Sequence, residues 1–478
     1  MYIFILKLFL NLFYINKHFI EAKEYDKIYP ENIKKERENM NVGFISLGCS
    51  KNLVDTEMTI GLFKKHDFKI VNNPVYADII VINTCGFIES AKQEAINTIL
   101  EMAEYKNGNC KFLIVMGCLV ERYKKELKKA LPEVDLFLSI NEYEEFWEKV
   151  AKLISDSENN QDNKLDYLDR FITTGDTMAY LKIAEGCSNH CTYCAIPSIR
   201  GPFISRPIEE IVKEAEKLAK NGIKEIIVIA QDTTKYGIDL YGESKLADLL
   251  KRLEEIKEFT WIRFLYAYPE TITDELIEVV KNSKKICHYF DIPIQHISNP
   301  ILKKMNRRSD GESIRKLITK IRKEIPDAIL RTSLIVGFPG ETKEDFNELY
   351  EFVKETKFDK LGVFEYSKED GTPASILKEQ IHPQTKKSRY RKIMEIQQAA
   401  SEEKLKEKVG NSYKVLIENI SLDKRYWIGR TYMDVPDMDG VIFIKKDLNK
   451  NLMGQFVQCK VTDVKEYDLI GKVENNNI

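Results

Sequence analysis

The sequence predicts an α/β protein with three domains: a parallel-sheet α/β domain, an incomplete (β/α)6 barrel and a small carboxyl-terminal β-barrel. Three observations predict this class. Short apolar strands alternate with amphipathic helices from residue 41 to about 154, a pattern typical of a parallel sheet. The alternation resumes over residues 180–367 with six strand-like segments. Five short strands with glycine turns then follow a long charged helix.

The first domain is predicted over residues 41–154. Its apolar runs predict four strands, and the amphipathic runs between them predict helices. The expected strands are 42–48, 78–85, 111–118 and 135–139, and the expected helices are 58–66, 90–105, 120–131 and one around Phe146 and Trp147. The polar run 155–164 has almost nothing to bury, so we expect a linker over residues 155–172.

The second series of strands and helices contains six expected strands, whereas the first contains four. The expected strands are 180–186, 223–232, 261–269, 288–295, 329–340 and 360–367. Helical patterns lie between them, for example over 208–222, where Gly222 is placed to end the helix. A complete barrel has eight such units. Six units therefore predict an incomplete barrel, which we place at residues 173–405.

A charged helix expected over residues 383–410 connects the barrel to a β-rich remainder. The expected strands are 413–419, 426–431, 440–445, 454–464 and 468–473. Five short strands with glycine turns predict a small barrel of the OB-like type. We place this third domain at residues 406–473.

The first 39 residues begin with the apolar run MYIFILKLFLNLFYI. This run is shorter than the roughly 20 apolar residues that a membrane-spanning helix needs. No small-residue cleavage site follows it, and Met40 stands directly before the first expected strand. We therefore interpret residues 1–39 as an extension upstream of the native start. A signal peptide and an amphipathic anchor are the alternatives.

The composition predicts a soluble cytoplasmic protein without a membrane partner. Hydrophobic residues make up 43% and charged residues 31% of the 478 residues, as in globular proteins. The net charge of -2 gives no overall field that would attract nucleic acid or an acidic membrane. The nine cysteines are an odd number, and a chain of this length needs no disulfide bonds. Clustered thiols are then expected to be metal ligands in a reducing cytoplasm.

Three cysteines stand close together in GCSNHCTYCAIP, residues 186–197: Cys187, Cys191 and Cys194. They follow the first strand of the barrel, at the face where α/β barrels place their chemistry. A structural zinc site uses four protein ligands, whereas the next cysteine, Cys287, lies far along the chain. A disulfide bond between two of these three cysteines would leave the third thiol unpaired. A cubane iron–sulfur cluster has four irons, so three thiolates would leave one iron open for a small molecule.

The CxxxCxxC spacing in this context resembles the radical S-adenosylmethionine superfamily. The resemblance implies that the open iron binds the amino and carboxylate groups of S-adenosylmethionine, whose cleavage yields a 5′-deoxyadenosyl radical. Tyr193 stands where the family has an aromatic residue near the adenosine, and ordinary packing is the alternative. Gly337 and Gly340 in GFPGET follow the fifth strand. They permit close approach of the backbone to this ligand, or they form a plain tight turn.

A second set of three cysteines occurs in the first domain. Cys49, Cys85 and Cys118 each end a predicted strand, and each is adjacent to a glycine. The carboxyl ends of parallel strands lie along one edge of a sheet, where ligands bind in open α/β folds. We therefore expect these thiols to converge and to hold a second cluster with an open iron. The alternative, that free cysteines are buried as small apolar residues, suits Cys110, Cys287 and Cys459 better.

Two such triads in this order resemble the methylthiotransferases, and the resemblance covers nearly the whole chain from Met40. It implies an amino-terminal cluster domain, a radical barrel and a carboxyl-terminal TRAM domain. It also implies two 4Fe-4S clusters and two molecules of S-adenosylmethionine, one giving a methyl group and the other the radical. Cofactors carry such chemistry, so we predict no catalytic residue beyond the cluster ligands. The sequence identifies neither the sulfur donor nor the electron donor.

Four segments resemble the RimO group within this family. They are SLGCSKNLVDTE (46–57), AQDTTKYG (230–237), YFDIPIQHIS (289–298) and GTPA (371–374). The resemblance implies transfer of a methylthio group to the β-carbon of an aspartate of the twelfth small-subunit ribosomal protein.

Charge gives an independent argument about the substrate. From Gly410 to the end of the chain, ten Lys and Arg residues balance ten Asp and Glu residues. A domain that binds tRNA would be expected to be basic, so a neutral domain suits a protein substrate. The alternatives are methylthiolation of a tRNA adenosine and a non-catalytic iron–sulfur electron carrier. An electron carrier needs no substrate cavity, which the barrel and GFPGET argue against.

Overall fold

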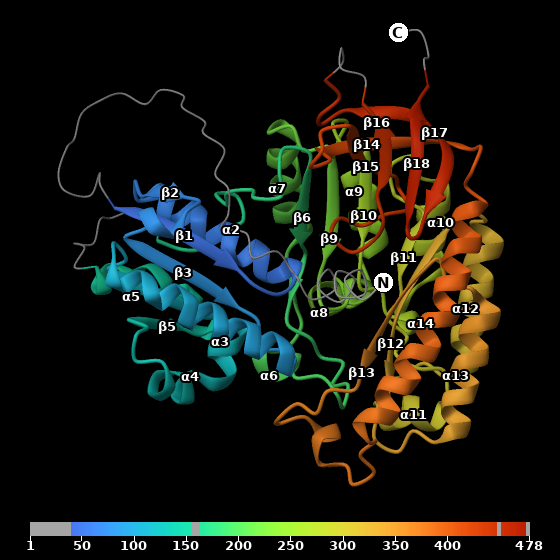
Figure 1. The fold of residues 1–478 in the computed structure, drawn as a ribbon, viewed down its shortest axis with the longest axis horizontal. Coiled ribbons are helices and arrows are strands. Elements are labelled where there is room, and N and C mark those ends of the chain that lie inside the picture. Colours follow the sequence, from blue (N-terminus) through green and yellow to red (C-terminus); the bar gives the residue numbers. More distant parts are fainter. Residues whose placement is uncertain (1–39, 155–162, 447–450, 475–478) are drawn as a thin grey trace. The chain divides into compact units, whose positions relative to one another are not determined.

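The computed structural model describes residues 40–154, 163–446 and 451–474 (Figure 1). They form two compact units. The first unit reaches Gly175 and includes the segments Glu185–Asn189 and Cys194–Phe203. The second unit holds the remaining described residues. The extension predicted at 1–39 and the first part of the predicted linker, 155–162, lie outside the described residues, and the exact domain boundaries stay a prediction.

The first unit is built on a parallel five-stranded sheet in the order β2-β1-β3-β4-β5. The strands are β1 (Asn41–Ser46), β2 (Lys69–Val71), β3 (Ile79–Thr84), β4 (Phe112–Gly117) and β5 (Leu136–Leu138). The helices are α2 (Ser50–Lys65), α3 (Glu89–Ala103), α4 (Cys118–Ala130) and α5 (Phe146–Leu153), with the short turns η2 (Pro74–Tyr76), η3 (Glu104–Asn107) and η4 (Ile140–Glu145). The predicted parallel α/β domain is thereby confirmed.

Both faces of this sheet are covered by helices. Alternate residues of a strand point to opposite faces. Ile80 and Ile82 of β3 pack with α3 and α4 in one apolar core. Ile79 and Val81 pack in a second core with α2 and α5, which contribute Phe63 among others. The two cores fix the helices over the sheet, so the loops at the strand ends start from rigid positions.

Two elements of this unit differ from the expectation. Helix α2 begins at Ser50, although apolar periodicity predicts a helix only from residue 58. Its first turns carry polar side chains that are nevertheless buried, including Asn52 and Asp55, and periodicity does not detect a buried polar face. Strand β2 was not expected because it is short and lies at the edge of the sheet.

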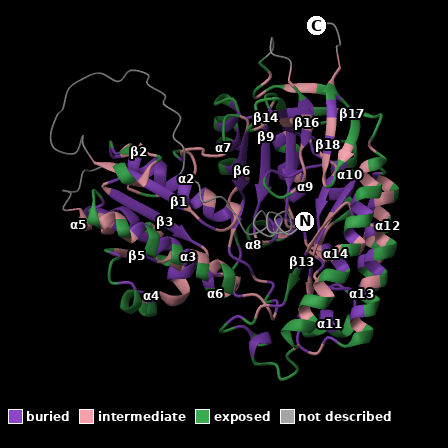
Figure 2. Ribbon diagram, in the orientation of Figure 1, coloured by how far each residue is buried: buried purple, intermediate pink, exposed green. Residues whose placement is uncertain are grey.

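The second unit contains the predicted incomplete barrel. Its strands form two parallel three-stranded sheets, β6-β9-β10 and β11-β12-β13, joined by a parallel bridge between Ile262 and Ile286. The strands are β6 (Met178–Lys182), β9 (Glu225–Ile229), β10 (Trp261–Phe264), β11 (Tyr289–Asp291), β12 (Ile329–Val336) and β13 (Lys360–Glu365). Strands β6, β9 and β10 are buried along their whole length (Figure 2), which fits strands between a barrel interior and covering helices.

Helices lie between these strands, as the alternation predicts, and the last long helix follows β13. The long ones are α7 (Ile208–Lys220), α9 (Leu246–Glu254), α10 (Asp274–Asn282), α12 (Gly311–Glu324), α13 (Lys343–Thr356) and α14 (Pro383–Lys406). The short elements are β7 (Ala184–Glu185), α6 (Ile196–Arg200), β8 (Ile204–Ser205), η5 (Thr233–Lys235), α8 (Ile238–Tyr241), η6 (Pro269–Thr271), α11 (Asn299–Lys304) and η7 (Pro373–Ile376). Gly222, at φ +96°, follows the end of α7 as expected. No helix of the described part of the chain is long and apolar enough to cross a membrane.

The carboxyl-terminal strands close into the small barrel that the sequence predicts, in the order β14-β15-β16-β18-β17. They are β14 (Ser412–Ile420), β15 (Tyr426–Arg430), β16 (Ile442–Lys445), β17 (Phe456–Lys465) and β18 (Asp468–Val473). Irregular register at Ile417/Asn419 and at Val461/Asp463 marks bulges, which bend strands into a closed sheet.

Buried charges attach this small barrel to the amino ends of the larger barrel's strands. Glu225, the first residue of β9, accepts a hydrogen bond from Arg430 Nη2 at 2.6 Å and one from Arg263 Nε at 3.2 Å. At β13, Lys360 pairs with Asp434 at 2.9 Å. The amino ends of the strands are thereby covered, so the carboxyl ends are left for binding and chemistry.

We predict that Glu225→Gln lowers the free energy of unfolding by about 3 kcal/mol, because it leaves two buried arginines without their shared anion. Burial alone raises the pKa of Glu225, but Arg430 and Arg263 outweigh burial and hold that pKa below its ordinary value. The stabilisation is therefore present at neutral pH and is lost as the pH falls through the folded-state pKa. Denaturant unfolding at several pH values measures both effects.

The matched control is Glu216→Gln, because Glu216 is exposed on α7. This variant should unfold like the wild type at every pH. Equal stability of the two variants would show that the Glu225 network contributes nothing.

Candidate functional site

Three cysteines of the first unit lie at the carboxyl edge of its sheet. Cys49 is the N-cap of α2 beyond β1, Cys85 directly follows β3, and Cys118 is the first residue of α4 after β4. Strands β1, β3 and β4 are neighbours in the sheet, so these positions share one edge, as the parallel-sheet argument expects. Their role as ligands stays a prediction.

The glycines beside these cysteines let the loops approach each other closely. Gly48 and Gly117 have φ values of +93° and +100°, which L-residues with a side chain rarely adopt. A Cβ atom at Gly48 would lie 2.7 Å from Cys85 Cβ. A Cβ atom at Gly86 would lie 2.7 Å from Leu119 Cα. Neither position has room for a larger residue, so the glycines bring the cysteine loops together.

The thiols are close enough to affect each other's ionisation. Burial raises the pKa of Cys118 to about 11, with Arg200 opposing and Cys49 adding to the rise. Burial also raises the pKa of Cys85, and Cys118 and Cys49 raise it further. Burial acts on Cys49 too, but Lys51, Arg200 and backbone N–H groups of α2 outweigh it and lower that pKa. Bringing three thiolates together is thus costly without a cationic partner, which iron would provide.

The spacing of these thiols differs from that of a site for one metal ion. Among the described residues, no group of three or more His, Cys, Asp or Glu side chains is arranged to hold one. In a cubane cluster, however, each thiolate binds an iron of its own. Ligand thiols therefore need not meet around a single centre, and the donor set of the triad fits a cluster.

A buried arginine lies beside the triad. Arg200, the last residue of α6, has a side chain only 1% exposed. Its Nη2 donates to Asp55 Oδ2 at 2.9 Å and to Asn52 Oδ1, and its Nη1 donates to Glu185 Oε1 at 2.9 Å. Asn52 Oδ1 also accepts a bond from Cys118 Sγ at 3.4 Å. Arg200 thereby holds the first turns of α2 in place and puts a positive charge near the thiols.

The CxxxCxxC loop divides between the two compact units. Cys187 and Cys194 belong to the first unit, where the Cys187 N–H donates to Gly201 O at 3.0 Å. Cys191 belongs to the second unit. The next residue, Thr192, donates from its N–H to Met305 O at 3.1 Å and from Oγ1 to Lys304 O at 2.8 Å. These bonds fix the loop segment around Cys191 against the end of α11.

Packing explains the presence of Tyr193, and backbone conformation explains the presence of Gly337 and Gly340. Tyr193 packs against an apolar cluster that includes Met305 and Phe338. Gly337 and Gly340 have φ values of +72° and +78°, and a Cβ atom there would meet side-chain atoms of Lys386 and Lys304, respectively. The backbone thus requires glycine at both positions. Contacts of these three residues with S-adenosylmethionine stay a prediction.

Sequence reasoning did not find Asn52, Asp55 or Arg200. Asn52 and Asp55 stand in a segment that lacks apolar periodicity, and Arg200 pairs with residues almost 150 positions earlier in the chain. The one available signal was the group of polar residues directly after Cys49 in SLGCSKNLVDTE.

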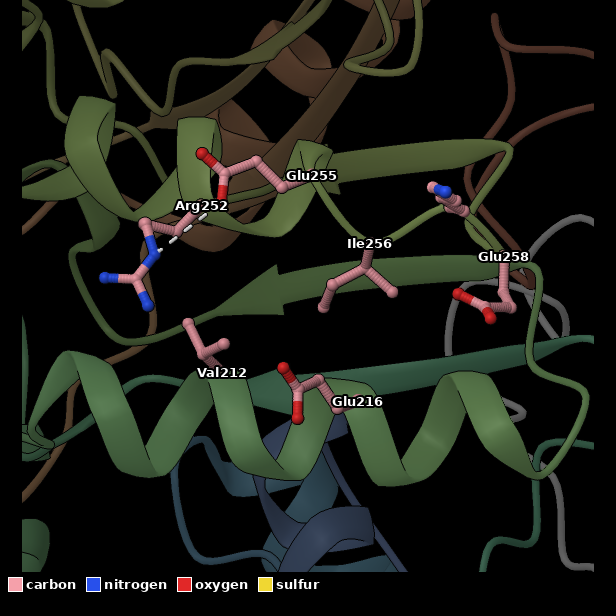
Figure 3. A pocket seen from close by; sticks show the side chains of 7 residues that line it. Val212, Glu216, Arg252, Glu255, Ile256 and Glu258 are labelled. Atoms are coloured by element: carbon pink, nitrogen blue, oxygen red, sulfur yellow. Dashed lines mark ion pairs between the residues drawn. The ribbon is translucent and has the colours of Figure 1, made fainter.

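A surface pocket in the second unit lies away from these groups. It is lined by Val212, Glu216, Arg252, Glu255, Ile256, Lys257 and Glu258 (Figure 3). Residues 256–258 lead into β10, so the pocket is at the amino end of that strand. Arg252 and Glu255 make an ion pair of 3.9 Å. The pocket contains none of the predicted site residues.

Comparisons with known families define the class of protein. The sequence matches the radical SAM superfamily over residues 181–353, the TRAM domain over residues 409–473, and a group described as uncharacterized protein family UPF0004 over residues 41–139. The chain is therefore a radical S-adenosylmethionine protein, a class that uses an iron–sulfur cluster and S-adenosylmethionine. The solved structure of the radical S-adenosylmethionine methyltransferase TsrM from Kitasatospora setae, with cobalamin and a 4Fe-4S cluster bound, has a similar fold. Its TM-score is 0.52 at 12% identity, covering 71% of this chain and 77% of that one.

Full-length relatives then identify the family. The ribosomal protein uS12 methylthiotransferase RimO of Alkaliphilus oremlandii is 67% identical over 434 residues, which cover 91% of this chain and 99% of that protein. RimO of Clostridium perfringens is 51% identical (91% and 98% covered) and RimO of Acetivibrio thermocellus is 49% identical (91% and 99%). The chain belongs to the RimO family of methylthiotransferases.

We predict that Arg200→Met lowers the free energy of unfolding of the apo-protein by about 3 kcal/mol, because it removes the cation from a buried ion pair. Lys111→Met is the matched control. Lys111 pairs with Asp78 at 3.0 Å, but its side chain is 62% exposed, so the loss should stay below about 1 kcal/mol. Urea unfolding measures both. An equally small loss in the two variants would contradict a structural role for Arg200.

Proposed function

We propose that this protein is an enzyme that transfers a methylthio group to the β-carbon of an aspartate of ribosomal protein uS12. The observation that carries the proposal is the convergence of Cys49, Cys85 and Cys118 in a domain that precedes a radical barrel with its own CxxxCxxC loop. A second thiol triad is unnecessary for generating a radical, but it suits a reaction that also transfers sulfur. The names and lengths of the relatives support the same conclusion.

The thiols fit two clusters with three ligands each. Cys187, Cys191 and Cys194 would hold one 4Fe-4S cluster, and Cys49, Cys85 and Cys118 would hold the other. Cys49 and Cys118 stand at the starts of α2 and α4, and a helix amino terminus favours a thiolate. Arg200 adds positive charge near the second triad. Six cysteines can serve as thiolate ligands only while they stay reduced, which requires a reducing compartment. We therefore place the enzyme in the cytoplasm.

The target bond explains the need for this chemistry. The β-carbon hydrogen of an aspartate is not acidic enough for a protein side chain to remove it as a proton at a useful rate. When bound, the clusters and two molecules of S-adenosylmethionine supply the radical, methyl and sulfur chemistry that replaces this hydrogen. The chain itself binds and orients the reactants.

A protein substrate also fits the small carboxyl-terminal barrel. Its ten basic and ten acidic residues from Gly410 onwards leave no net charge. Affinity for nucleic acid depends strongly on neutralising phosphates, whereas a protein surface can be recognised by shape and specific contacts. We expect the binding of uS12 to show mild salt dependence.

We predict that anaerobic reconstitution loads about eight irons per chain, the content of two cubane clusters. Replacing Cys187, Cys191 and Cys194 by Ala should halve the iron and abolish formation of 5′-deoxyadenosine. Replacing Cys49, Cys85 and Cys118 by Ala should also halve the iron, but some cleavage of S-adenosylmethionine should remain. Iron analysis and chromatography of the nucleoside products measure these outcomes.

The control for this series is Cys110→Ala. Cys110 is buried among apolar residues of the first unit, and this variant should keep its full iron content. Unchanged iron in the Cys49, Cys85 and Cys118 variant would refute the second cluster.

We further predict that uS12 gains one SCH₃ group in place of one hydrogen when incubated with the enzyme, S-adenosylmethionine, a reductant and a sulfide source. The modification should lie on one aspartate, because the radical must reach a single C–H bond. Mass spectrometry of uS12 and of unmodified tRNA, treated in parallel, measures it. Modification of a tRNA adenosine alone would overturn the proposal, and an electron carrier would modify neither.

A further inference from the structure

Four large apolar side chains are exposed close together in the second unit: Ile204 of β8 and Ile238, Leu240 and Tyr241 of α8. Their exposed fractions are 59%, 43%, 46% and 40%, respectively. Single exposed apolar residues are common on protein surfaces and need no explanation, whereas several together indicate a site of interaction. We call these four residues the α8 patch.

Hydrogen bonds hold α8 against β8, so the α8 patch is formed before any partner binds. Ser205 donates to the carboxylate of Asp239 from its N–H at 2.8 Å and from its Oγ at 2.6 Å. The Gly237 N–H donates to Ser205 Oγ at 2.9 Å, and the Ile208 N–H donates to the hydroxyl of Tyr241 at 3.1 Å. A preformed surface loses little conformational entropy on binding, which favours affinity.

The base of the loop that carries α8 is also fixed. Tyr236 is fully buried, and its hydroxyl donates to Arg206 O at 2.7 Å. Its carbonyl accepts a bond from the Lys245 N–H at 2.7 Å, which closes the loop. Gly237 and Gly242, with φ values of +91° and +83°, turn the chain sharply on both sides of α8. The loop therefore presents its apolar side chains from a rigid base.

The α8 patch belongs to the rim of the barrel at the carboxyl ends of its strands. Helix α8 follows β9 through η5, in which the Thr233 N–H donates to Tyr266 O at 3.1 Å and Thr233 Oγ1 donates to Leu265 O at 2.7 Å. Leu265 and Tyr266 directly follow β10. Barrels of this kind carry out their chemistry at this face. A protein substrate must therefore lay the surface around its reacting residue against this rim.

Charges beside the α8 patch favour a basic partner. Glu209 and Glu210 are exposed at the start of α7, next to Ile208, which bonds to Tyr241. Arg206 and Lys245 are each paired with carboxylates, so their positive charge is compensated. A ribosomal protein binds the phosphates of RNA and is therefore expected to be basic, whereas RNA itself would be repelled by exposed carboxylates.

We propose that the α8 patch is a docking surface for uS12, the protein substrate. An apolar surface of uS12 near the target aspartate covers the four side chains, and basic residues of uS12 lie opposite Glu209 and Glu210. The proposal rests on the function proposed above and adds the place where the substrate binds. The α8 patch positions uS12 and takes no part in bond breaking.

The first experiment measures binding of labelled uS12 to the reconstituted full-length enzyme by fluorescence anisotropy. Ile238→Ser and Leu240→Ser are combined, because both side chains are exposed and their loss leaves the core intact. The double variant should raise the Kd for uS12 at least about tenfold, since apolar side chains at the centre of an interface account for most of its affinity. Leu240→Met keeps the size and apolar character of the side chain, and should bind uS12 like the wild type.

The second experiment separates docking from chemistry by following methylthiolation of uS12 over a range of concentrations. The double variant should need at least about tenfold more uS12 for its half-maximal rate, and its rate at saturating uS12 should be unchanged. A docking surface contributes equally to binding of the ground state and of the transition state, so only the concentration dependence shifts. A lower saturating rate with an unchanged concentration dependence would contradict a docking role.

Leu100→Ser is the matched control. Leu100 lies on α3 of the first unit and is 44% exposed, close to the 46% of Leu240. This variant should bind uS12 like the wild type. Iron content and thermal unfolding establish that each variant is folded and loaded. Unchanged binding in the double variant, or an equal loss in Leu100→Ser, would overturn the docking surface.

Other occupants of the α8 patch give different results. Sedimentation velocity tests a second copy of the chain: a wild-type dimer that the double variant dissociates, with binding of uS12 unchanged, would overturn the proposal. Weaker binding of unmodified tRNA by the double variant, again with binding of uS12 unchanged, would overturn it in favour of RNA. If uS12 binds through the α8 patch but is never modified, the docking surface stands and the proposed function fails.

Discussion

Parallel pairing of β1, β3 and β4 places three chain segments from distant parts of the sequence at one edge of a sheet, and the candidate site of the first unit depends on this constraint. Each strand delivers a cysteine at its carboxyl end. The two apolar cores hold the strands and helices rigidly, so the thiols are positioned by packing rather than by local sequence. Glycines next to the cysteines then let the loops approach within contact distance.

Convergence of thiols has an electrostatic cost that the surrounding residues reduce. Burial and mutual repulsion raise the pKa of Cys85 and Cys118, while Arg200 and the amino terminus of α2 favour ionisation nearby. Arg200 is itself buried, and Asp55 and Glu185 compensate its charge. This charged network is buried beside the three thiols, where the proposed second cluster would supply further positive charge.

Buried charges of the second unit gather at the amino ends of its barrel strands. At the amino ends, Arg430 and Asp434 pair with Glu225 and Lys360, respectively, and Glu225 also pairs with Arg263. Buried ion pairs thus attach the small barrel to the larger one at the amino ends of its strands.

The sequence by itself determined the order and type of nearly all elements, the three-domain organisation and the two cysteine triads. Periodicity and spacing are local properties, and Cys49, Cys85 and Cys118 each follow a strand that its own neighbours specify. Tertiary structure decided which polar residues become buried. Asn52 and Asp55 interrupt the periodicity of α2, and their burial depends on Arg200, which is almost 150 residues away. Burial of a charge depends on partners that are distant in the chain, and a linear pattern does not contain them.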